Sequence, residues 1–147
     1  MRFSHLVFAL CLLLCPFSWA SAQSVLYVDG SRAYAGTGES WENPLKDLDA
    51  AIDRARSGDE IWVAQGVYTP RGTSPSASFV LKDGVAIYGG FVGLEARRED
   101  RDPARYPTVL SGDRNQDDRL NRFEDNVYHV VRAKNVGKTT VLDGVTV

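Results

Sequence analysis

The feature that most constrains the fold of this 147-residue chain is a series of short β-branched and aromatic segments at long, regular intervals. Five such segments follow residue 58, and most of them end at Gly, Asp or Asn. The apolar centres of the first four lie about 20 to 26 residues apart, at Ile61, Ile87, Val109 and Val130. An antiparallel sandwich more often shows turn signals every ~8 to 12 residues. The spacing favours a solenoid that adds one strand to a stacked parallel sheet in every coil, with an open sandwich as the alternative.

One helix is predicted before these segments, within residues 41–59. Asn43 is the expected N-cap, and Pro44 the first helical residue, where its missing N–H costs nothing. Four apolar residues then recur at three- and four-residue spacing: Leu45, Leu48, Ile52 and Ala55. They form a single stripe, so we expect the helix to lie flat against the strands.

The first 22 residues are typical of a secretory signal peptide. Arg2 precedes an apolar run over residues 6–14, and Ala20 and Ala22 have the small-residue spacing of a cleavage site. The apolar run is too short to span a bilayer comfortably. We therefore expect cleavage after Ala22 and a mature chain, residues 23–147, that is secreted or held at the cell surface.

The mature chain has no cysteine, because Cys11 and Cys15 both lie in the predicted signal peptide. Its stability must come from core burial, backbone hydrogen bonds or bound ions rather than from disulfides. Of the 17 basic residues only Arg2 is removed, so 16 face 19 acidic ones, a net charge of −3. This balance offers no electrostatic case for binding nucleic acid or an anionic membrane.

An acidic segment, "DRNQDDRLNRFE", is the sharpest candidate site. Its oxygen-bearing side chains have the spacing of an EF-hand-like calcium loop. These candidate ligands are Asp113, Asn115, Asp117, Asn121 and Glu124. Against calcium, Asp118 stands where the sharp turn of such a loop needs Gly, and no helices are expected on either side. The alternative is a hydrated loop whose acids pair with the neighbouring Arg114, Arg119 and Arg122.

The remaining chemistry-bearing residues have plain structural interpretations. A sugar-stacking platform could draw on five aromatic residues: Trp41, Trp62, Tyr68, Tyr88 and Phe91. Burial is the expected role for Trp41, which adjoins the helix cap, and for Trp62, which lies within "EIWVA", because aromatic residues dominate the cores of small domains. The charged segment of residues 95–107 is expected to be a hydrated loop, with a lip that contacts oligosaccharide as the alternative. No pair of carboxylates or other catalytic group is tied together by its spacing, so no catalytic residue is assigned.

Several motifs resemble the N-terminal part of bacterial secreted right-handed parallel β-helix proteins of pectin-lyase-like fold. The longest is "SWENPLKDLDAAIDRARSGDEIWVAQGVYTP". Four more match in order after the opening "YVD" of residues 27–29: "YGGFVG", "PTVLSGD", "NVYHVV" and "VLDGVTV". The resemblance implies an all-β solenoid, a right-handed parallel β-helix whose N-terminal α-helix caps one end. Residues 23–147 would be this cap and the first coils, truncated at the C-terminus compared with the family.

The resemblance also implies a function. We expect a secreted or surface-exposed module that is non-catalytic and binds carbohydrate or mediates adhesion. The alternatives are a polysaccharide lyase or glycoside hydrolase, or a structural capping fragment of a longer protein. No cofactor is required, and calcium is the one candidate. The expected partner is extracellular polysaccharide rather than nucleic acid, the chain does not span a membrane, and its uncapped C-terminal end self-associates or pairs with further coils.

Overall fold

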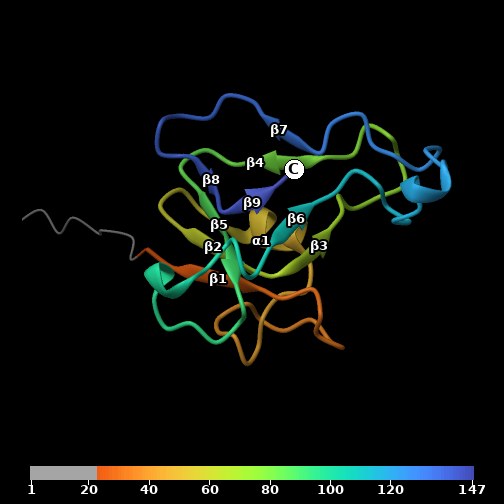
Figure 1. Ribbon diagram of the computed structural model, residues 1–147. Helices are drawn as coiled ribbons and strands as arrows, with labels where there is room; N and C mark the ends of the chain where they lie inside the picture. Colours follow the sequence, from red (N-terminus) through yellow and green to blue (C-terminus); the bar gives the residue numbers. More distant parts are fainter. Residues whose placement is uncertain (1–22) are drawn as a thin grey trace, which may run out of the picture.

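Residues 23–147, which the computed structural model describes, contain three parallel sheets that the chain visits in turn (Figure 1). The first sheet has the order β1 (Val25–Val28), β2 (Glu60–Ala64), β5 (Ala86–Phe91) and β8 (Val141–Asp143). The second has the order β3 (Gly66–Tyr68), β6 (Thr108–Leu110) and β9 (Val145–Thr146). The third pairs β4 (Phe79–Leu81) with β7 (Val131–Ala133). Every pair of described strands is parallel, as the spacing predicted.

The predicted fold class, an all-β solenoid of the right-handed parallel β-helix type, is wrong. The described residues form a small mixed α/β domain with parallel sheets and one α-helix, and no closed solenoid is found among them. The helix α1 (Leu48–Arg54) shares its buried core with strands of all three sheets. The spacing of apolar segments predicts how often the chain returns to a sheet. It does not predict whether the sheets close into a solenoid or whether a helix joins their core.

Helix α1 begins four residues later than the predicted first helical residue, Pro44. Leu45 is extended rather than helical, because its N–H donates to Tyr27 O (2.8 Å) and its carbonyl accepts from Asp29 N (2.8 Å) along the edge of β1. Asp47 is the N-cap instead, and its carboxylate accepts from Ala50 N at 3.2 Å. All four residues of the predicted apolar stripe are buried, but only Leu48 and Ile52 lie within the helix, so the helical stripe is shorter than predicted.

The main core lies between α1 and the inward faces of the strands. The helix packs against β1, β2 and β4. Ile61 pairs in register with Ile87, which pairs with Leu142, so three aliphatic side chains of the first sheet stack along one line. Ile61 and Ile87 are fully buried, and each such side chain contributes about 1.5–3 kcal/mol through removal from water. Leu142, on the edge strand β8, is only partly buried.

A second, aromatic core covers the outer face of the same sheet. Tyr27 pairs in register with Trp62. The Trp62 ring stacks on Phe91 at 4.9 Å between centroids, and Trp41 meets Tyr27 edge-on at the same separation. Trp41 also donates its indole N–H to Glu95 O (3.1 Å), which ties a surface segment over this core. The burial expected for Trp41 and Trp62 is therefore confirmed, and Phe91 is buried with them.

That surface segment, residues 92–107, is called the strap here. It contains the 3₁₀ helix η1 (Arg98–Asp100), and the guanidinium groups of Arg98 and Arg101 lie 4.8 and 5.2 Å from the centre of the Tyr88 ring. Arg98 also forms an ion pair with the buried Glu60 at 2.7 Å. Most of the segment is exposed, in keeping with the predicted hydrated loop, but two of its arginines lie over the sheet.

The described part of the chain has no helix long and apolar enough to cross a bilayer. The predicted signal peptide, residues 1–22, lies outside the described residues.

Candidate functional site

The acidic loop, residues 111–130, connects β6 to β7 and contains the short 3₁₀ helix η2 (Asp118–Leu120). It folds back on itself at Gln116 and Asn121, whose φ angles of 55° and 56° are left-handed. The Asp113 carboxylate holds this turn, because it accepts from the backbone N–H groups of Asp117 (3.1 Å) and Asp118 (3.2 Å).

Three carboxylates converge inside this loop. Those of Asp113, Asp117 and Asp125 each offer an oxygen, and these oxygens lie within 4.8 Å of one another. All three residues are half-buried. Three like charges at this separation repel one another, and partial burial weakens the screening by water, so the arrangement favours a bound cation.

Two buried acceptor oxygens of the loop lack a donor. Asp117 Oδ1 and Asn126 Oδ1 are shielded from solvent and accept no hydrogen bond from the described residues. Burying an acceptor without a donor is unfavourable, so such atoms usually face an ion or an ordered water. Both atoms are of the kind that a hard cation prefers as ligand.

The neighbouring arginines do not neutralise the cluster. Arg114 donates to the backbone carbonyls of Thr73 (3.0 Å) and Ser74 rather than to a carboxylate. Arg122 is 3.9 Å from Asp117, at the limit of an ion pair, and is itself exposed. No ion pair of the described residues involves Arg119. The alternative of acids paired with arginines therefore accounts for little of this loop.

The pKa of Asp117 is shifted in the opposite direction from those of Asp29 and Asp59, two acids whose carboxylates accept several hydrogen bonds. Loss of hydration and the nearby carboxylates of Asp125 and Asp113 raise the pKa of Asp117. Burial alone would also raise the pKa values of Asp29 and Asp59, yet hydrogen bonds lower both. Asp59, for example, accepts from Arg56 N (2.8 Å) and from the Ser24 hydroxyl (2.8 Å). Asp117 lacks such donors, and Arg122 at 3.9 Å offsets only part of the repulsion from the neighbouring carboxylates.

The predicted ligand set overlaps the cluster in two residues, Asp113 and Asp117. Asn115, Asn121 and Glu124 are exposed. The sequence pattern missed Asp125, whose carboxylate also accepts from Asn115 N at 2.8 Å. The EF-hand spacing pointed to the residue before it, because that pattern assumes a loop without η2 and without the left-handed turn at Asn121.

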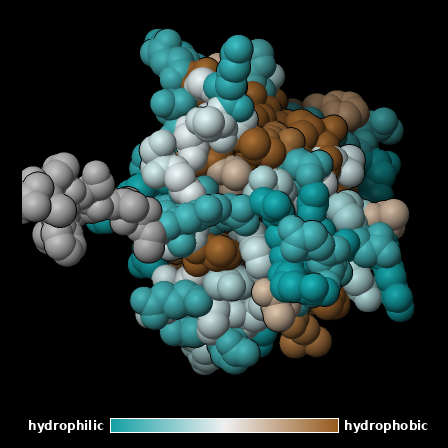
Figure 2. All heavy atoms as spheres, turned by 90° about the vertical axis from the view of Figure 1, so that its left-hand side faces the viewer, coloured by the Kyte–Doolittle hydropathy of each residue, from teal (hydrophilic) through white to brown (hydrophobic). Residues whose placement is uncertain are grey.

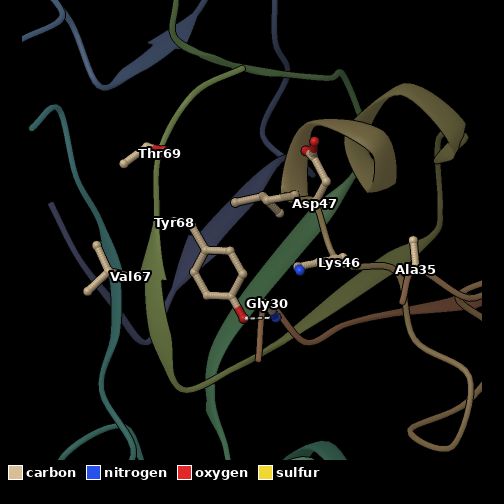
Figure 3. A pocket seen from close by; sticks show the side chains of 8 residues that line it. Gly30, Ala35, Lys46, Asp47, Val67, Tyr68 and Thr69 are labelled. Atoms are coloured by element: carbon tan, nitrogen blue, oxygen red, sulfur yellow. Dashed lines mark hydrogen bonds between the residues drawn. The ribbon is translucent and has the colours of Figure 1, made fainter. Parts of the chain in front are cut away.

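A separate cleft of about 490 Å³ opens between β3 and the segment that leads into α1 (Figure 3). It is lined by Gly30, Ala35, Lys46, Asp47, Leu48, Val67, Tyr68 and Thr69. Tyr68 forms its floor: the hydroxyl accepts from Gly30 N (3.2 Å) and donates to Ala64 O (3.0 Å), and burial raises the pKa of Tyr68 to about 12. Lys46 extends toward Tyr68, and no ion pair of the described residues involves it.

The five aromatic residues considered for a sugar-stacking platform do not form an exposed one. Tyr68 is 6% exposed, and Trp41, Trp62 and Phe91 belong to the aromatic core. Tyr88 is partly buried beneath the two arginines of the strap. A saccharide at the cleft would therefore be bound through polar and charged groups rather than by stacking on these five rings.

Comparison of the chain with protein-family models, with curated proteins and with solved structures finds no match in any of the three. The resemblance drawn from the sequence motifs therefore stays a prediction, and the function is argued from the site alone.

Proposed function

We propose that this chain is an exported, non-catalytic binding module whose acidic loop holds a divalent cation, with Ca²⁺ as the expected ion. The observation that carries the proposal is the convergence of the Asp113, Asp117 and Asp125 carboxylates within 4.8 Å. The buried, donor-free oxygens of Asp117 and Asn126 support the same conclusion.

Calcium suits this cluster better than a softer metal does. Ca²⁺ binds roughly six to eight oxygen ligands at distances of 2.3–2.6 Å, and it tolerates irregular geometry. Transition metals prefer imidazole or thiolate ligands, whereas the three converging side chains are all carboxylates. Calcium also accepts an irregular set of oxygen ligands more readily than magnesium, which requires near-octahedral geometry.

Calorimetric titration of the chelator-treated mature chain with CaCl₂ tests the proposal. We expect a heat of binding and a higher melting temperature, since a ligand at about a hundredfold its Kd adds about 2.7 kcal/mol of stability. Asp117→Asn and Asp125→Asn should each abolish both signals. Glu39→Gln, which neutralises an exposed acid outside the loop, is the matched control and should leave them unchanged. No heat and no thermal shift in the wild-type chain would contradict the proposal.

The expected macromolecular partner is an acidic extracellular polysaccharide bound at the cleft of Figure 3. Support comes from Lys46, whose ammonium group extends over a concave surface where a uronate carboxylate could pair with it. Oligogalacturonate should bind and a neutral xylo-oligosaccharide should not, and Lys46→Gln should remove binding while Lys134→Gln keeps it. Equal binding by the two Lys variants would contradict this assignment.

The same mixtures separate the binding module from the lyase and hydrolase alternatives. A non-catalytic module leaves the oligosaccharide intact, whereas a lyase releases unsaturated products and a hydrolase releases new reducing ends. Either product would overturn the non-catalytic proposal.

Self-association through one end of the molecule is the remaining part of the proposal. The strands β7, β8 and β9 each stand at the edge of their sheet, with backbone groups open to a further partner. Figure 2 shows apolar residues gathered in the upper part of the molecule, at the level of β7 and β8 in Figure 1. Sedimentation velocity should show a weight that rises with concentration, and a stable monomer at micromolar concentration would contradict this part.

A further inference from the structure

The chain is fixed to the start of strand β2 from Ser24 onward. Ser24 donates its backbone N–H (3.1 Å) and its hydroxyl (2.8 Å) to Asp59 Oδ1, and Glu60 N donates to the Ser24 carbonyl at 2.9 Å. Gln23, the residue before it, is exposed, and its Nε2 donates to Glu60 Oε1 at 3.1 Å. Cleavage after Ala22 would therefore leave a single residue, Gln23, outside the anchored strand.

An N-terminal glutamine carries two groups that can react with each other. Its α-amine can attack the carbonyl carbon of its own side chain, which closes a lactam ring and releases ammonia. Both groups belong to one residue, so the reaction is intramolecular and no second molecule has to be brought to the site. The exposure of Gln23 leaves its side chain free to turn back toward that amine.

Glu60 lies beside the nitrogen atom that has to leave. Its side chain is only 11% exposed. Glu60 Oε2 accepts from Trp62 Nε1 and Oε1 accepts from Arg98 Nη1, each at 2.7 Å, so the carboxylate is held in place. Oε1 is also 3.1 Å from Gln23 Nε2, a distance at which a carboxylate can transfer a proton. An amide nitrogen leaves readily only once it is protonated, so a proton carrier at this position assists ring closure.

We propose that the mature chain modifies its own N-terminus, converting Gln23 to pyroglutamate with Glu60 as the group that carries the proton. The α-amine nitrogen forms a bond to Cδ, and the Cδ–Nε2 bond breaks. Glu60 takes a proton from the attacking amine and gives it to Nε2, which leaves as ammonia. The proposal rests on the export of the chain in the proposed function, because cleavage after Ala22 is what frees the α-amine of Gln23.

Ring closure changes the mature end of the chain in two ways. It removes the positive charge that the α-amine carries at neutral pH. It also removes Nε2 from Glu60 Oε1 and leaves that oxygen to Arg98, whose guanidinium lies over Tyr88. Aminopeptidases require a free α-amine, so the product resists degradation from this end.

Timed mass spectrometry tests the inference on a mature chain released at Gln23 from a removable N-terminal tag. We expect its N-terminal peptide to lose the mass of one ammonia at neutral pH. The loss should be about tenfold faster in the folded chain than in guanidinium chloride, where Glu60 no longer lies beside Gln23. Glu60→Gln should slow the loss in the folded chain about tenfold and leave the rate in guanidinium chloride unchanged.

Glu99→Gln is the matched control, since Glu99 is an exposed acid that also pairs with Arg98, at 3.4 Å. It should cyclise at the wild-type rate. Equal rates in the folded and unfolded chains, or no slowing in Glu60→Gln, would overturn the role of Glu60.

The mass of the chain recovered from a secreting host separates this inference from the export on which it rests. A chain that begins with an unmodified Gln23 and stays so would overturn the modification and leave export intact. A first residue other than Gln23 would contradict cleavage after Ala22, and with it the modification of the exported chain.

Discussion

The strap and the acidic loop are both rich in arginines and carboxylates, yet they use these charges in opposite ways. In the strap, arginines meet acids: Arg98 pairs with Glu60, and Arg101 pairs with Asp143. In the acidic loop, the carboxylates face one another, and Arg114 donates to backbone carbonyls instead. Similar composition therefore leads to a neutralised surface in one place and to an uncompensated acidic cluster in the other.

The difference lies in what each loop packs against. The strap covers the outer face of the first sheet, where the strands hold Glu60, Tyr88 and Asp143 in fixed positions beneath it. The acidic loop meets another loop, whose nearest acceptors for Arg114 are the carbonyls of Thr73 and Ser74. In this molecule, the arginines of the strap therefore reach carboxylates on the sheet, whereas Arg114 of the acidic loop donates to backbone carbonyls.

The largest effect should come from removing the anchor of the strap. Trp41→Ala deletes a buried ring and the indole N–H that donates to Glu95 O, so the free energy of unfolding should fall by about 3–5 kcal/mol. Urea denaturation measures it. Tyr34→Ala, at an exposed aromatic residue, should stay within about 0.5 kcal/mol of the wild type. Similar losses in the two variants would show that the strap does not depend on Trp41.

The next effect should come from the acid that the strap neutralises. Glu60 accepts from Trp62 Nε1 and from Arg98 Nη1, each at 2.7 Å. Glu60→Ala leaves the buried indole N–H without an acceptor, so we expect a loss of about 2 kcal/mol in denaturant unfolding. Glu60→Gln keeps an acceptor and should lose less. If the Gln variant were the less stable of the two, the proposed role of the acceptor would be wrong.

The acidic loop should respond to pH in the opposite direction from a neutralised acid. The pKa of Asp117 in the folded chain is raised above its ordinary value of 3.8, which applies to the unfolded chain. At a pH between the unfolded and the folded pKa, the folded chain therefore binds more protons than the unfolded chain. Without calcium, this group should therefore lower stability as the pH rises through that window. Thermal melts in EGTA across pH measure it.

Asp117→Asn cannot ionise and provides the comparison. In EGTA at neutral pH it should melt above the wild type, and in saturating CaCl₂ it should melt below it. The pKa values of Asp29 and Asp59 are lowered, and both acids are present in the wild type and in the variant. Their effect on the melting temperature therefore cancels when the two chains are compared. Parallel pH profiles of the two chains would contradict the assignment of repulsion to Asp117.

The smallest effect should come from an exposed ion pair within the strap, between two side chains that do not pack over the sheet. Arg97 pairs with Asp100 at 2.8 Å, three residues away, and its side chain is 74% exposed. Arg97→Ala should leave the urea midpoint unchanged. Water screens the attraction between the two side chains, so the ion pair contributes little to the free energy of unfolding. A clear loss would mean that the whole charge network of the strap acts together.

Local chemistry decided some features, and these could be predicted from the sequence. The helical stripe is buried because its spacing leaves only one apolar face, and the strands are parallel because they recur at long intervals. The start of the helix could not be predicted, since Asn43 and Pro44 form a plausible cap by themselves. Leu45 joins the edge of β1 through contacts with Tyr27 and Asp29, which are distant in sequence.

The sequence by itself determined the long-interval parallel strands, the amphipathic helix and the acidic character of residues 113–125, because each depends on residue type and short-range spacing. Tertiary structure alone decided that the helix and sheets share one core, that the strap lies on Tyr88, and that Asp125 rather than Glu124 joins Asp113 and Asp117. These depend on where the backbone turns and on which distant groups become neighbours, and no local pattern encodes such distances.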